Sequence, residues 1–491
     1  MSHDPEGAVH HGVDLERAIA NVPLSSLPQG KFGRMFGALT AFEPDTDLLE
    51  DLGKPDGPMQ EGPNAEDNDQ IPAGFTYLGQ FIDHDITFDP VSNIAKMNDP
   101  DSLHNFRTPR FDLDSVYGLG RNTSPFLYNR RNGDKLLTGE NDAGEPDLPR
   151  NSQSIALIGD PRNDENILLS QLHVAVSHFH NAIVDHLKKK KANFENAKLP
   201  GEKLFDTAQR LVRWHYQWII VHDFLPRTAG KAVVDSLLTV KSNGEHEITL
   251  VLYQPQNEPF IPIEFGAAAY RFGHSQVRPD YQLNNEIFAS IFGEEGAPPL
   301  THLGGSRKLP DAWQIRWPLF FKFPQIKPQL TRKINAKLAP PLMDLPASVI
   351  GKAERENHPK RRSLATRNLL RGRVLRLPSG QAVAAEMGET VLSNADLGLS
   401  DPEWGGEAPL WFYVLKESER PPHNAKRLGP VGGRIVAETI LGLLKHDDHS
   451  FVNATTPWKP KSPIAPKAGE FTFTDLVKFA DIVEGGDGPG D

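Results

Sequence analysis

The stretch Gly-Gln-Phe-Ile-Asp-His-Asp, residues 79–85, places an imidazole between two carboxylates, with an amide one helical turn earlier. On a helix, Gln80 and His84 are four residues apart and share a face. Asp83 and Asp85 lie to either side of that face. One short segment therefore offers a polar pair to a bound ligand, a carboxylate that can anchor the ligand, and a second carboxylate for a separate metal site.

Helical periodicity recurs through the rest of the chain. Apolar residues repeat at three- and four-residue spacing most clearly in 166–187, 202–225 and 432–444, and the best candidate strand is 247–253. We predict a mainly α fold, a large single domain with very little β-structure.

The composition at the two ends predicts the domain organisation. Residues 43–72 are rich in proline, glycine and acids, which is typical of surface loops, and the last segment is rich in proline and glycine. We predict an N-terminal arm with surface loops over 1–70, a main domain over 71–450, and a C-terminal tail over 451–491 that is docked or partly disordered.

Charge and composition limit the partners. The net charge of -11 disfavours nucleic acid and favours a small-molecule substrate, and the absence of cysteine leaves any metal to histidine or oxygen ligands. No apolar run of about 18 residues occurs, so no membrane span is expected. Residues 1–13 do not resemble a secretory leader, which predicts a cytoplasmic protein or export without a classical signal peptide. A monomer is the default expectation.

The loop at 108–118 carries oxygen-bearing groups at alternate positions, which face the same way in an extended chain: Thr108, Arg110, Asp112 and Asp114. Hydroxyl, carboxylate and backbone carbonyl oxygens are the ligands that Ca²⁺ prefers, and Asp85 can supply a further one. The alternative is a polar turn in which Asp112 or Asp114 caps the next element.

The segment 159–166 directly precedes the N-terminus of the next predicted helix. Arg162 and Glu165 are three residues apart, so a guanidinium and a carboxylate can enter one pocket. The alternative is a helix cap in which the carboxylates of Asp164 and Glu165 interact favourably with the positive end of the helix dipole.

The segment Tyr270-Arg-Phe-Gly-His274 combines a glycine with a histidine. The glycine allows a flat ligand to approach closely, and the histidine can serve as an axial iron ligand. A structural histidine beside an aromatic ring is the alternative.

The joint order of these motifs resembles that of the animal-type haem peroxidases, the peroxidase-cyclooxygenase superfamily, over roughly residues 70–450. Leu428-Gly-Pro-Val-Gly-Gly-Arg434 looks like the C-terminal signature of bacterial members. The resemblance implies a helical haem peroxidase fold. It also implies an enzyme that reduces hydrogen peroxide through a ferryl intermediate and oxidises halide, thiocyanate or aromatic donors.

By resemblance, the catalytic residues are His84 as the distal acid and base, Arg162 as the charge stabiliser and Gln80 as their pocket companion. A neutral imidazole can move the peroxide proton from one oxygen to the other, and a fixed cation stabilises the charge on the departing oxygen.

The cofactor implied is a haem b-derived group, ester-linked to the protein through Asp83 and Glu165. His274 would bind the iron, and the amide oxygen of Asn368 would accept a hydrogen bond from the other ring nitrogen. Arg271 belongs to the same proximal motif.

The second ion implied is Ca²⁺. The resemblance assigns to it Asp85 and the alternating loop residues Thr108, Arg110, Asp112 and Asp114. Because Asp85 directly follows His84, calcium is expected to fix the position of the distal histidine.

Two departures from the family pattern narrow the activity. Asn166 stands where the chlorinating member has a methionine, which excludes a sulfonium link and disfavours chloride oxidation. Arg271 stands where cyclooxygenases have a radical tyrosine, which favours a peroxidase over a fatty-acid dioxygenase.

Two other functions remain open. His84-Asp85 is also the doublet of metal-dependent phosphohydrolases, whose metal cage would be completed by His173, His178 and His180. A haem-binding protein without turnover is the third possibility, and the intact His84, Arg162 and His274 argue against it.

Overall fold

The computed structural model describes residues 30–87, 104–105, 107–255, 258–293 and 299–483. The prediction about a leader at 1–13 lies outside these residues. The described chain is mainly helical and has one large hydrophobic core, so the predicted fold class is confirmed.

The longer α-helices are α2 (Thr46–Gly53), α3 (Gly74–Ile86), α5 (Ile167–Lys189), α7 (Leu204–Ile219), α13 (Leu364–Val374), α16 (Leu410–Glu419) and α17 (Pro430–Lys445). The shorter ones are α4 (Asp114–Tyr117), α6 (Lys191–Ala197), α8 (Lys231–Leu237), α9 (Ile263–Ala267), α10 (Pro340–Met343), α11 (Ala347–Ile350), α12 (Lys352–Asn357), α14 (Gly380–Glu386), α15 (Asn394–Leu397) and α18 (Phe473–Phe479).

Strands are short and lie in separate small sheets. β1 (Gly30–Gly33) pairs antiparallel with β3 (His104–Asn105) and parallel with β8 (Phe260–Pro262). The other pairs are antiparallel: β2 (Asp67–Pro72) with β11 (Leu330–Arg332), β4 (Gly139–Glu140) with β5 (Pro146–Asp147), β6 (Leu238–Val240) with β7 (His246–Ile248), and β9 (Asp280–Gln282) with β10 (Phe288–Ser290).

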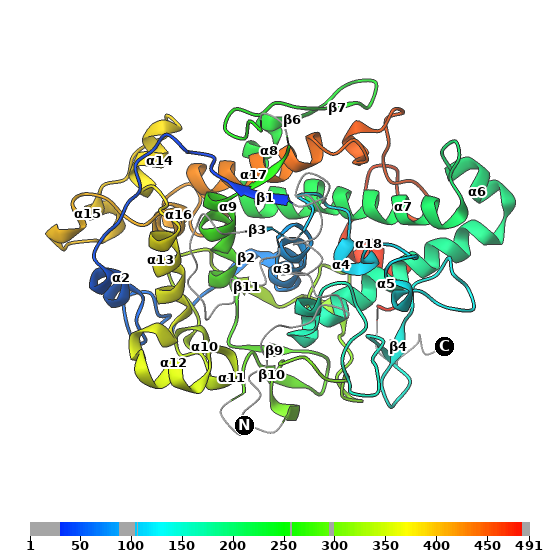
Figure 1. The fold of residues 1–491 in the computed structure, drawn as a ribbon, viewed down its shortest axis with the longest axis horizontal. Helices are drawn as coiled ribbons and strands as arrows, with labels where there is room; N and C mark the ends of the chain where they lie inside the picture. Colours follow the sequence, from blue (N-terminus) through cyan, green and yellow to red (C-terminus); the bar gives the residue numbers. More distant parts are fainter. Residues whose placement is uncertain (1–29, 88–103, 106, 256–257, 294–298, 484–491) are drawn as a thin grey trace, which may run out of the picture.

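Helix α3 occupies the middle of the molecule and packs against α5, which packs in turn against α7 (Figure 1). Its apolar residues Phe75, Leu78, Phe81 and Ile82 are all buried. α3 ends at Thr87, whose hydroxyl and backbone N–H both donate to the carbonyl of Asp83. The helix that carries the residues 79–85 is therefore surrounded by protein along most of its length.

The three helices predicted from periodicity are present. The first and third are α5 and α17, and the second is α7, which continues as the π-helix η6 (Ile220–Phe224). The side chain of Asn166 accepts from the N–H of Leu168 and so caps α5. Lys188 and Lys189 lie in the last turn of α5, at the negative end of its dipole.

The prediction of a surface loop at 43–72 is wrong. This segment contains α2 and β2, and it buries Leu49, Met59 and Ile71 in the core. Helix α2 packs against α13, where a Cβ added at Gly53 would lie 2.5 Å from the backbone nitrogen of Thr366. The domain boundaries themselves stay a prediction.

The predicted strand at 247–253 is too long. Only β7 forms, because the next backbone N–H groups are used elsewhere: those of Val251, Leu252 and Tyr253 all donate to Oε2 of the buried Glu438 on α17. A carboxylate on a helix distant in sequence therefore accepts the hydrogen bonds that a neighbouring strand would accept in a sheet.

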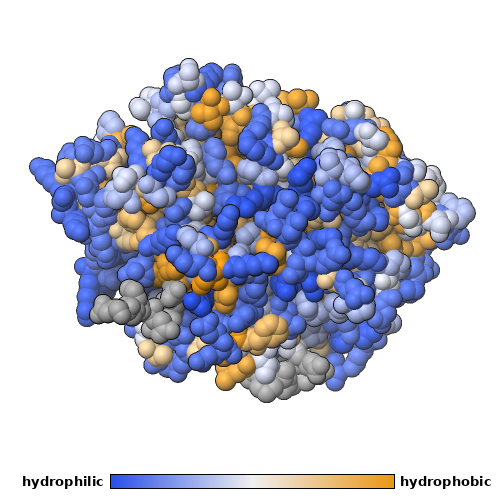
Figure 2. Space-filling view, turned by 180° about the vertical axis from the view of Figure 1, so that it is seen from behind, coloured by the Kyte–Doolittle hydropathy of each residue, from blue (hydrophilic) through white to orange (hydrophobic). Residues whose placement is uncertain are grey.

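The described part of the C-terminal segment is docked. Phe471, Phe473 and Leu476 are buried, and α18 packs against α5. None of the described helices is both long enough and apolar enough to cross a membrane. In Figure 2 the face opposite that of Figure 1 is mainly hydrophilic, with apolar residues in small groups.

Candidate active site

His84 is buried near the C-terminal end of α3, with only 5% of its surface exposed. Its Nδ1 lies 2.9 Å from Oδ1 of Asn163, so Nδ1 carries the proton that it donates to this amide. Nε2 is left unprotonated and faces Glu165, with Oε1 at 3.9 Å. Burial, together with the charge of Arg162, lowers the pKa of His84 to about 3. The imidazole is therefore neutral and has the tautomer of a base.

Arg162 lies on the 3₁₀ helix η5 (Pro161–Asp164), next to α3. Its Nη2 donates to the carbonyls of His84 at 3.1 Å and of Thr87 at 2.5 Å, and to Oδ2 of Asp160 at 2.8 Å. Asp160 also accepts from the backbone N–H and Nε of Arg162. The predicted guanidinium is thus fixed beside the predicted distal histidine.

Gln80 and Glu165 are brought together as the sequence predicts. Nε2 of Gln80 donates to Oε1 of Glu165 at 2.5 Å. The Glu165 side chain is 49% exposed, yet burial raises its pKa to about 7. The carboxyl of Glu165 is therefore accessible although many protein atoms lie around it.

Asp83 directly precedes His84 on α3 and lies near the same charged groups. Burial raises its pKa, and the opposing charges that act on it come from Arg162 and Arg271. The charge of Asp83 is in turn among those that act on Glu165. The two predicted ester-forming carboxyls therefore lie near one another, and Asp83 lies between a distal and a proximal arginine.

His274 lies on the 3₁₀ helix η8 (Ala269–Gln276). Its Nδ1 is 2.8 Å from the amide nitrogen of Asn368 on α13, so the two residues predicted to pair are in contact. Burial lowers the pKa of His274 to about 3, and the charge of Arg271 adds to this effect. His274 is therefore a neutral imidazole, the form that binds a metal.

The orientation of the Asn368 amide differs from the prediction. Its Oδ1 accepts from Nη1 of Arg271 at 2.9 Å, so the amide nitrogen, not the oxygen, faces His274. Arg271 stands three residues before His274, where its guanidinium reaches the same amide. Burial lowers the pKa of Arg271 to about 10. The local reason for the difference is that a guanidinium can only donate, so it takes the carbonyl side of the amide.

A direct contact joins the proximal helix to α3. The hydroxyl of Tyr270 on η8 donates to the carbonyl of Gly79 at 3.1 Å. The two sets of residues, separated by almost two hundred positions in sequence, thus flank one region of the interior. Two neutral histidines, one buried and one partly buried, with neighbouring carboxyls and flanking arginines fit a haem with its two propionates.

The predicted calcium residues also come together. Carboxylate oxygens of Asp85, Asp112 and Asp114 lie within 4.8 Å of one another. Both oxygens of Asp85 are buried without a hydrogen bond, whereas Oδ1 of Asp114 lies 2.9 Å from Nη1 of Arg107. Burial raises the pKa of Asp85 well above its usual value and that of Asp114 to about 7, and neighbouring carboxylates add to both shifts. Clustered carboxylates that lack donors are suited to a hard divalent cation.

The loop around this cluster is held by helix α7. Nε of Arg213 donates to the carbonyl of Asp112, and Nε2 of Gln217 donates to that of Phe111 at 2.9 Å. Leu113 takes a left-handed conformation with φ of 57°, which turns the chain between the two aspartates. The backbone is therefore shaped by groups outside the loop.

The remaining two predicted calcium residues flank the cluster. Oγ1 of Thr108 donates to Oδ2 of Asp112 at 2.9 Å, and the N–H of Arg110 donates to the carbonyl of Thr108. Asp112 also accepts from the N–H of Asp114, as in the polar turn that was the alternative. The turn and the acidic cluster coexist.

The phosphohydrolase alternative is not supported. Both ring nitrogens of His180 are used, by the hydroxyl of Tyr117 at 3.0 Å and the carbonyl of Asp134 at 2.9 Å. Nδ1 of His173 lies 3.3 Å from the Asn163 amide. Within the described ranges, the candidate metal-binding group contains no histidine.

Three further residues of the site were not identified from the sequence: Asn163, Asp160 and Arg107. Asn163 and Asp160 lie in the segment 159–166, where the polar spacing around Arg162 was the available signal. Arg107 directly precedes the calcium loop, and no local pattern marks it.

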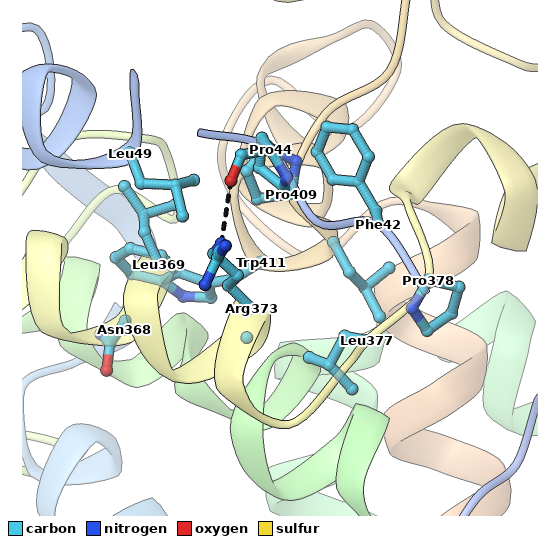
Figure 3. Close-up of a pocket in the computed structure, with 12 residues that line it drawn as sticks. Phe42, Pro44, Leu49, Asn368, Leu369, Arg373, Leu377, Pro378, Pro409 and Trp411 are labelled. Carbon is cyan, nitrogen blue, oxygen red and sulfur yellow. Dashed lines mark hydrogen bonds between the residues drawn. The ribbon is translucent and has the colours of Figure 1, made fainter. Parts of the chain in front are cut away.

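A separate pocket of about 310 Å³ lies behind the proximal residues, between α2, α13 and α16 (Figure 3). Asn368 and Trp411 are among its lining residues, and Nε of Arg373 donates to the carbonyl of Pro44 at its edge. Neither His84 nor His274 lines it, so this pocket is not the region that the two histidines flank.

Comparison with known proteins identifies the family. The model of the animal haem peroxidase family matches residues 93–395, more than half of the chain. This range contains the loop 108–118, Arg162, Glu165, His274 and Asn368, and it begins after the segment 79–85.

Relatives are similar over part of their length. Peroxidasin of Drosophila melanogaster is 28% identical over 231 residues, which cover 46% of this chain and 13% of that protein. Thyroid peroxidase of Canis lupus familiaris is 26% identical over 301 residues, which cover 56% of this chain and 29% of that protein. The chain thus matches less than a third of the length of either relative.

Solved structures share the fold. Peroxidase A from Dictyostelium discoideum superposes with a TM-score of 0.62 at 14% identity, covering 93% of both chains. Fatty acid alpha-dioxygenase of Oryza sativa superposes with a TM-score of 0.55 at 17% identity, covering 91% of this chain and 80% of that one. Together with the family match, the fold leads to one conclusion: the chain belongs to the animal haem peroxidase family.

Proposed function

We propose that this protein binds haem between His84 and His274 and reduces hydrogen peroxide, oxidising small donors such as bromide, iodide, thiocyanate or phenols. The observation that supports this proposal most is the pair of neutral imidazoles, His84 buried and His274 partly buried, each beside an asparagine amide, with Asp83 under the charges of Arg162 and Arg271. Bound haem would supply the two electrons that cleavage of the peroxide O–O bond requires.

His84 moves the proton in this proposal. Its unprotonated Nε2 takes the proton from the peroxide oxygen that approaches the haem and returns it to the oxygen that leaves. The bond from Nδ1 to Asn163 keeps the other nitrogen protonated, so Nε2 stays available. A pKa of about 3 keeps the base neutral throughout the physiological range.

Arg162 stabilises the charge that develops on the leaving oxygen. A guanidinium held by Asp160 and by two carbonyls at the end of α3 is preorganised, so little reorganisation is needed when charge develops. Gln80 donates to Glu165 and thereby holds this carboxyl near His84.

On the other side, His274 is the proximal ligand in our proposal, with Asn368 setting the orientation of its ring. In the structure Arg271 donates to the amide oxygen of Asn368, so the amide nitrogen faces Nδ1 of His274. Iron binding through Nε2 would require the proton on Nδ1, with the amide turned so that its oxygen accepts from that N–H. A neutral amide acceptor donates less electron density to a metal-bound imidazole than a carboxylate would.

Asp83 and Glu165 are proposed as the carboxyls that form esters with the haem. The charge of Asp83 acts on Glu165, and burial raises the pKa of both, which favours the uncharged carboxyl. Covalent attachment would keep the cofactor in place during oxidising turnover.

Calcium is proposed to bind Asp85, Asp112 and Asp114, with Thr108 and the carbonyl of Arg110 completing the site. The acidic cluster and its unpartnered buried oxygens support this assignment. Since Asp85 follows His84 on α3, the ion would fix the C-terminal end of that helix.

A peroxidase is favoured over the dioxygenases that share the fold. Arg271 occupies the position of the radical tyrosine, and the nearby Tyr270 hydroxyl is bonded to the carbonyl of Gly79. Asn166 caps α5 and offers no sulfur for a third link to haem. The bacterial origin and the monomeric state stay predictions.

The direct test is an absorption spectrum of the purified protein with and without peroxide, followed by turnover with bromide, iodide, thiocyanate and a phenol. A Soret band that shifts on peroxide addition and peroxide-dependent oxidation of at least one donor are expected. A colourless protein after growth with ample haem would refute the proposal.

A further inference from the structure

Arg107 lies between the acidic cluster and the distal arginine. It is 8% exposed, and its Nη1 is 2.9 Å from Oδ1 of Asp114, a member of the cluster. Its Nη2 donates to Oδ2 of Asp160 at 2.7 Å and to the carbonyl of Gly159 at 3.2 Å. One guanidinium therefore joins the cluster to the segment that carries Arg162.

Asp160 continues the connection. It is fully buried, and its two oxygens accept from Arg107 and from three nitrogens of Arg162: the backbone N, Nε and Nη2. The orientation of Arg162 is therefore set by a carboxylate whose other partner is Arg107. Asp114, Arg107, Asp160 and Arg162 form one continuous chain of ion pairs.

We infer that Arg107 and Asp160 are positioning residues that couple occupancy of the calcium site to the orientation of Arg162. The inference deepens the proposed function and rests on it. A cation at the cluster relieves the repulsion among Asp85, Asp112 and Asp114 and fixes Asp114. Without it, Asp114 shifts, and the displacement passes through Arg107 and Asp160 to Arg162.

The coupling requires a planar group with several donors. A guanidinium reaches two carboxylates at once in a fixed fork, whereas the ammonium group of lysine is a point charge on a flexible stem. Arg107→Lys thus keeps the charge and breaks the geometric connection. By thermodynamic linkage, an effect of calcium on an anion bound beside Arg162 equals the effect of that anion on calcium binding.

Cyanide bound to the ferric holoenzyme is a suitable probe, because its negative charge is stabilised by a nearby guanidinium. The test measures its dissociation constant from the Soret shift, in calcium-loaded and calcium-depleted protein. In the wild type we expect calcium to tighten cyanide binding about tenfold. Calcium titrations with and without cyanide should give the same factor.

In Arg107→Lys the calcium-dependent factor should fall to near one, while calcium still binds. Asp160→Asn removes the same connection from the other side and should have the same effect, so it decides the question if the first variant does not fold. Arg210→Lys is the matched control. Arg210 also bridges a carboxylate, of Glu202, and a carbonyl, of Ala197, but lies in the first half of α7. It should keep the wild-type factor.

The outcomes separate the two proposals. A wild type that binds haem and cyanide without any calcium effect, or an Arg107→Lys variant that keeps the full factor, would overturn the coupling and leave the proposed function intact. A wild type that binds no haem would refute both. A variant that only loses thermal stability, with an unchanged factor, would assign Arg107 to folding alone.

Discussion

The Nδ1 atom of His84 and the Oδ1 atom of Asn163 are 2.9 Å apart in the interior of the protein, and this one bond determines which nitrogen of the imidazole acts as base. The hydrogen bond to Asn163 raises the pKa of His84, but the amide is neutral and favours the imidazolium less than a carboxylate would. The low pKa of His84 follows from burial and the positive charge of Arg162, which the amide does not offset.

Replacing this amide with a carboxylate should change the pH dependence of peroxide cleavage. In the wild type the base loses activity only as pH falls through its pKa of about 3, so kcat/KM for peroxide should be flat from pH 5 to 8. In Asn163→Asp the added negative charge stabilises the imidazolium and raises the pKa of His84 by about 1–3 units.

The acidic limb of the Asn163→Asp profile should therefore move to higher pH. Asn181→Asp is the control and should keep the wild-type profile. Asn181 lies in the second half of α5, where its side-chain amide pairs with the backbone of Leu136. An unshifted profile in Asn163→Asp would mean that His84 is not the titrating base.

His84→Ala should separate haem binding from peroxide cleavage. The iron is assigned to His274, so the variant should retain its haem, while the loss of the acid and base should lower the rate of peroxide reaction about 10²–10⁴-fold. Stopped-flow spectra of the peroxide reaction provide the measurement. His173→Ala, which removes a neighbouring imidazole that also contacts Asn163, is the comparison and should lose much less.

The ester assignment predicts the behaviour of the cofactor on denaturation. Extraction of the wild type with acidic acetone should leave haem on the protein, and Asp83→Asn or Glu165→Gln should each leave one link. The double variant should release its haem completely. Asp164→Asn, which removes the neighbouring carboxylate that pairs with Arg150, should retain both links. Release of unmodified haem from the wild type would reject the esters.

Removing calcium should lower both stability and activity. At calcium concentrations about 100 times the dissociation constant, binding to the folded state adds about 2.7 kcal/mol to the free energy of unfolding. Chelation should therefore lower Tm, and restored calcium should reverse the change. Asp85→Asn should weaken calcium binding in the same assays. Full activity in protein shown to be free of calcium would contradict the assigned role.

Much of the site follows from local spacing. Gln80 and His84 share a face because they are one helical turn apart. The alternation of polar residues in the loop 108–118 can likewise be seen in the sequence, without knowing which segments pack against the loop. The periodicity of α5, α7 and α17 predicted a helical fold, because each helix buries one face over many residues.

Long-range contacts were not predictable in the same way. The docking of 43–72 depends on α13, and the short β7 depends on Glu438, both distant in sequence. The amide of Asn368 faces His274 with its nitrogen because Arg271 takes its oxygen, a competition that spacing does not reveal.

The sequence by itself determined the kinds of groups in the site and which of them share a helix face, because helix geometry repeats over a few residues. Only the tertiary structure decided that Asn163 fixes the tautomer of His84 and that Arg107 and Asp160 connect the acidic cluster to Arg162. These relationships join separate segments of chain, and their distances are set by how the helices pack around the core.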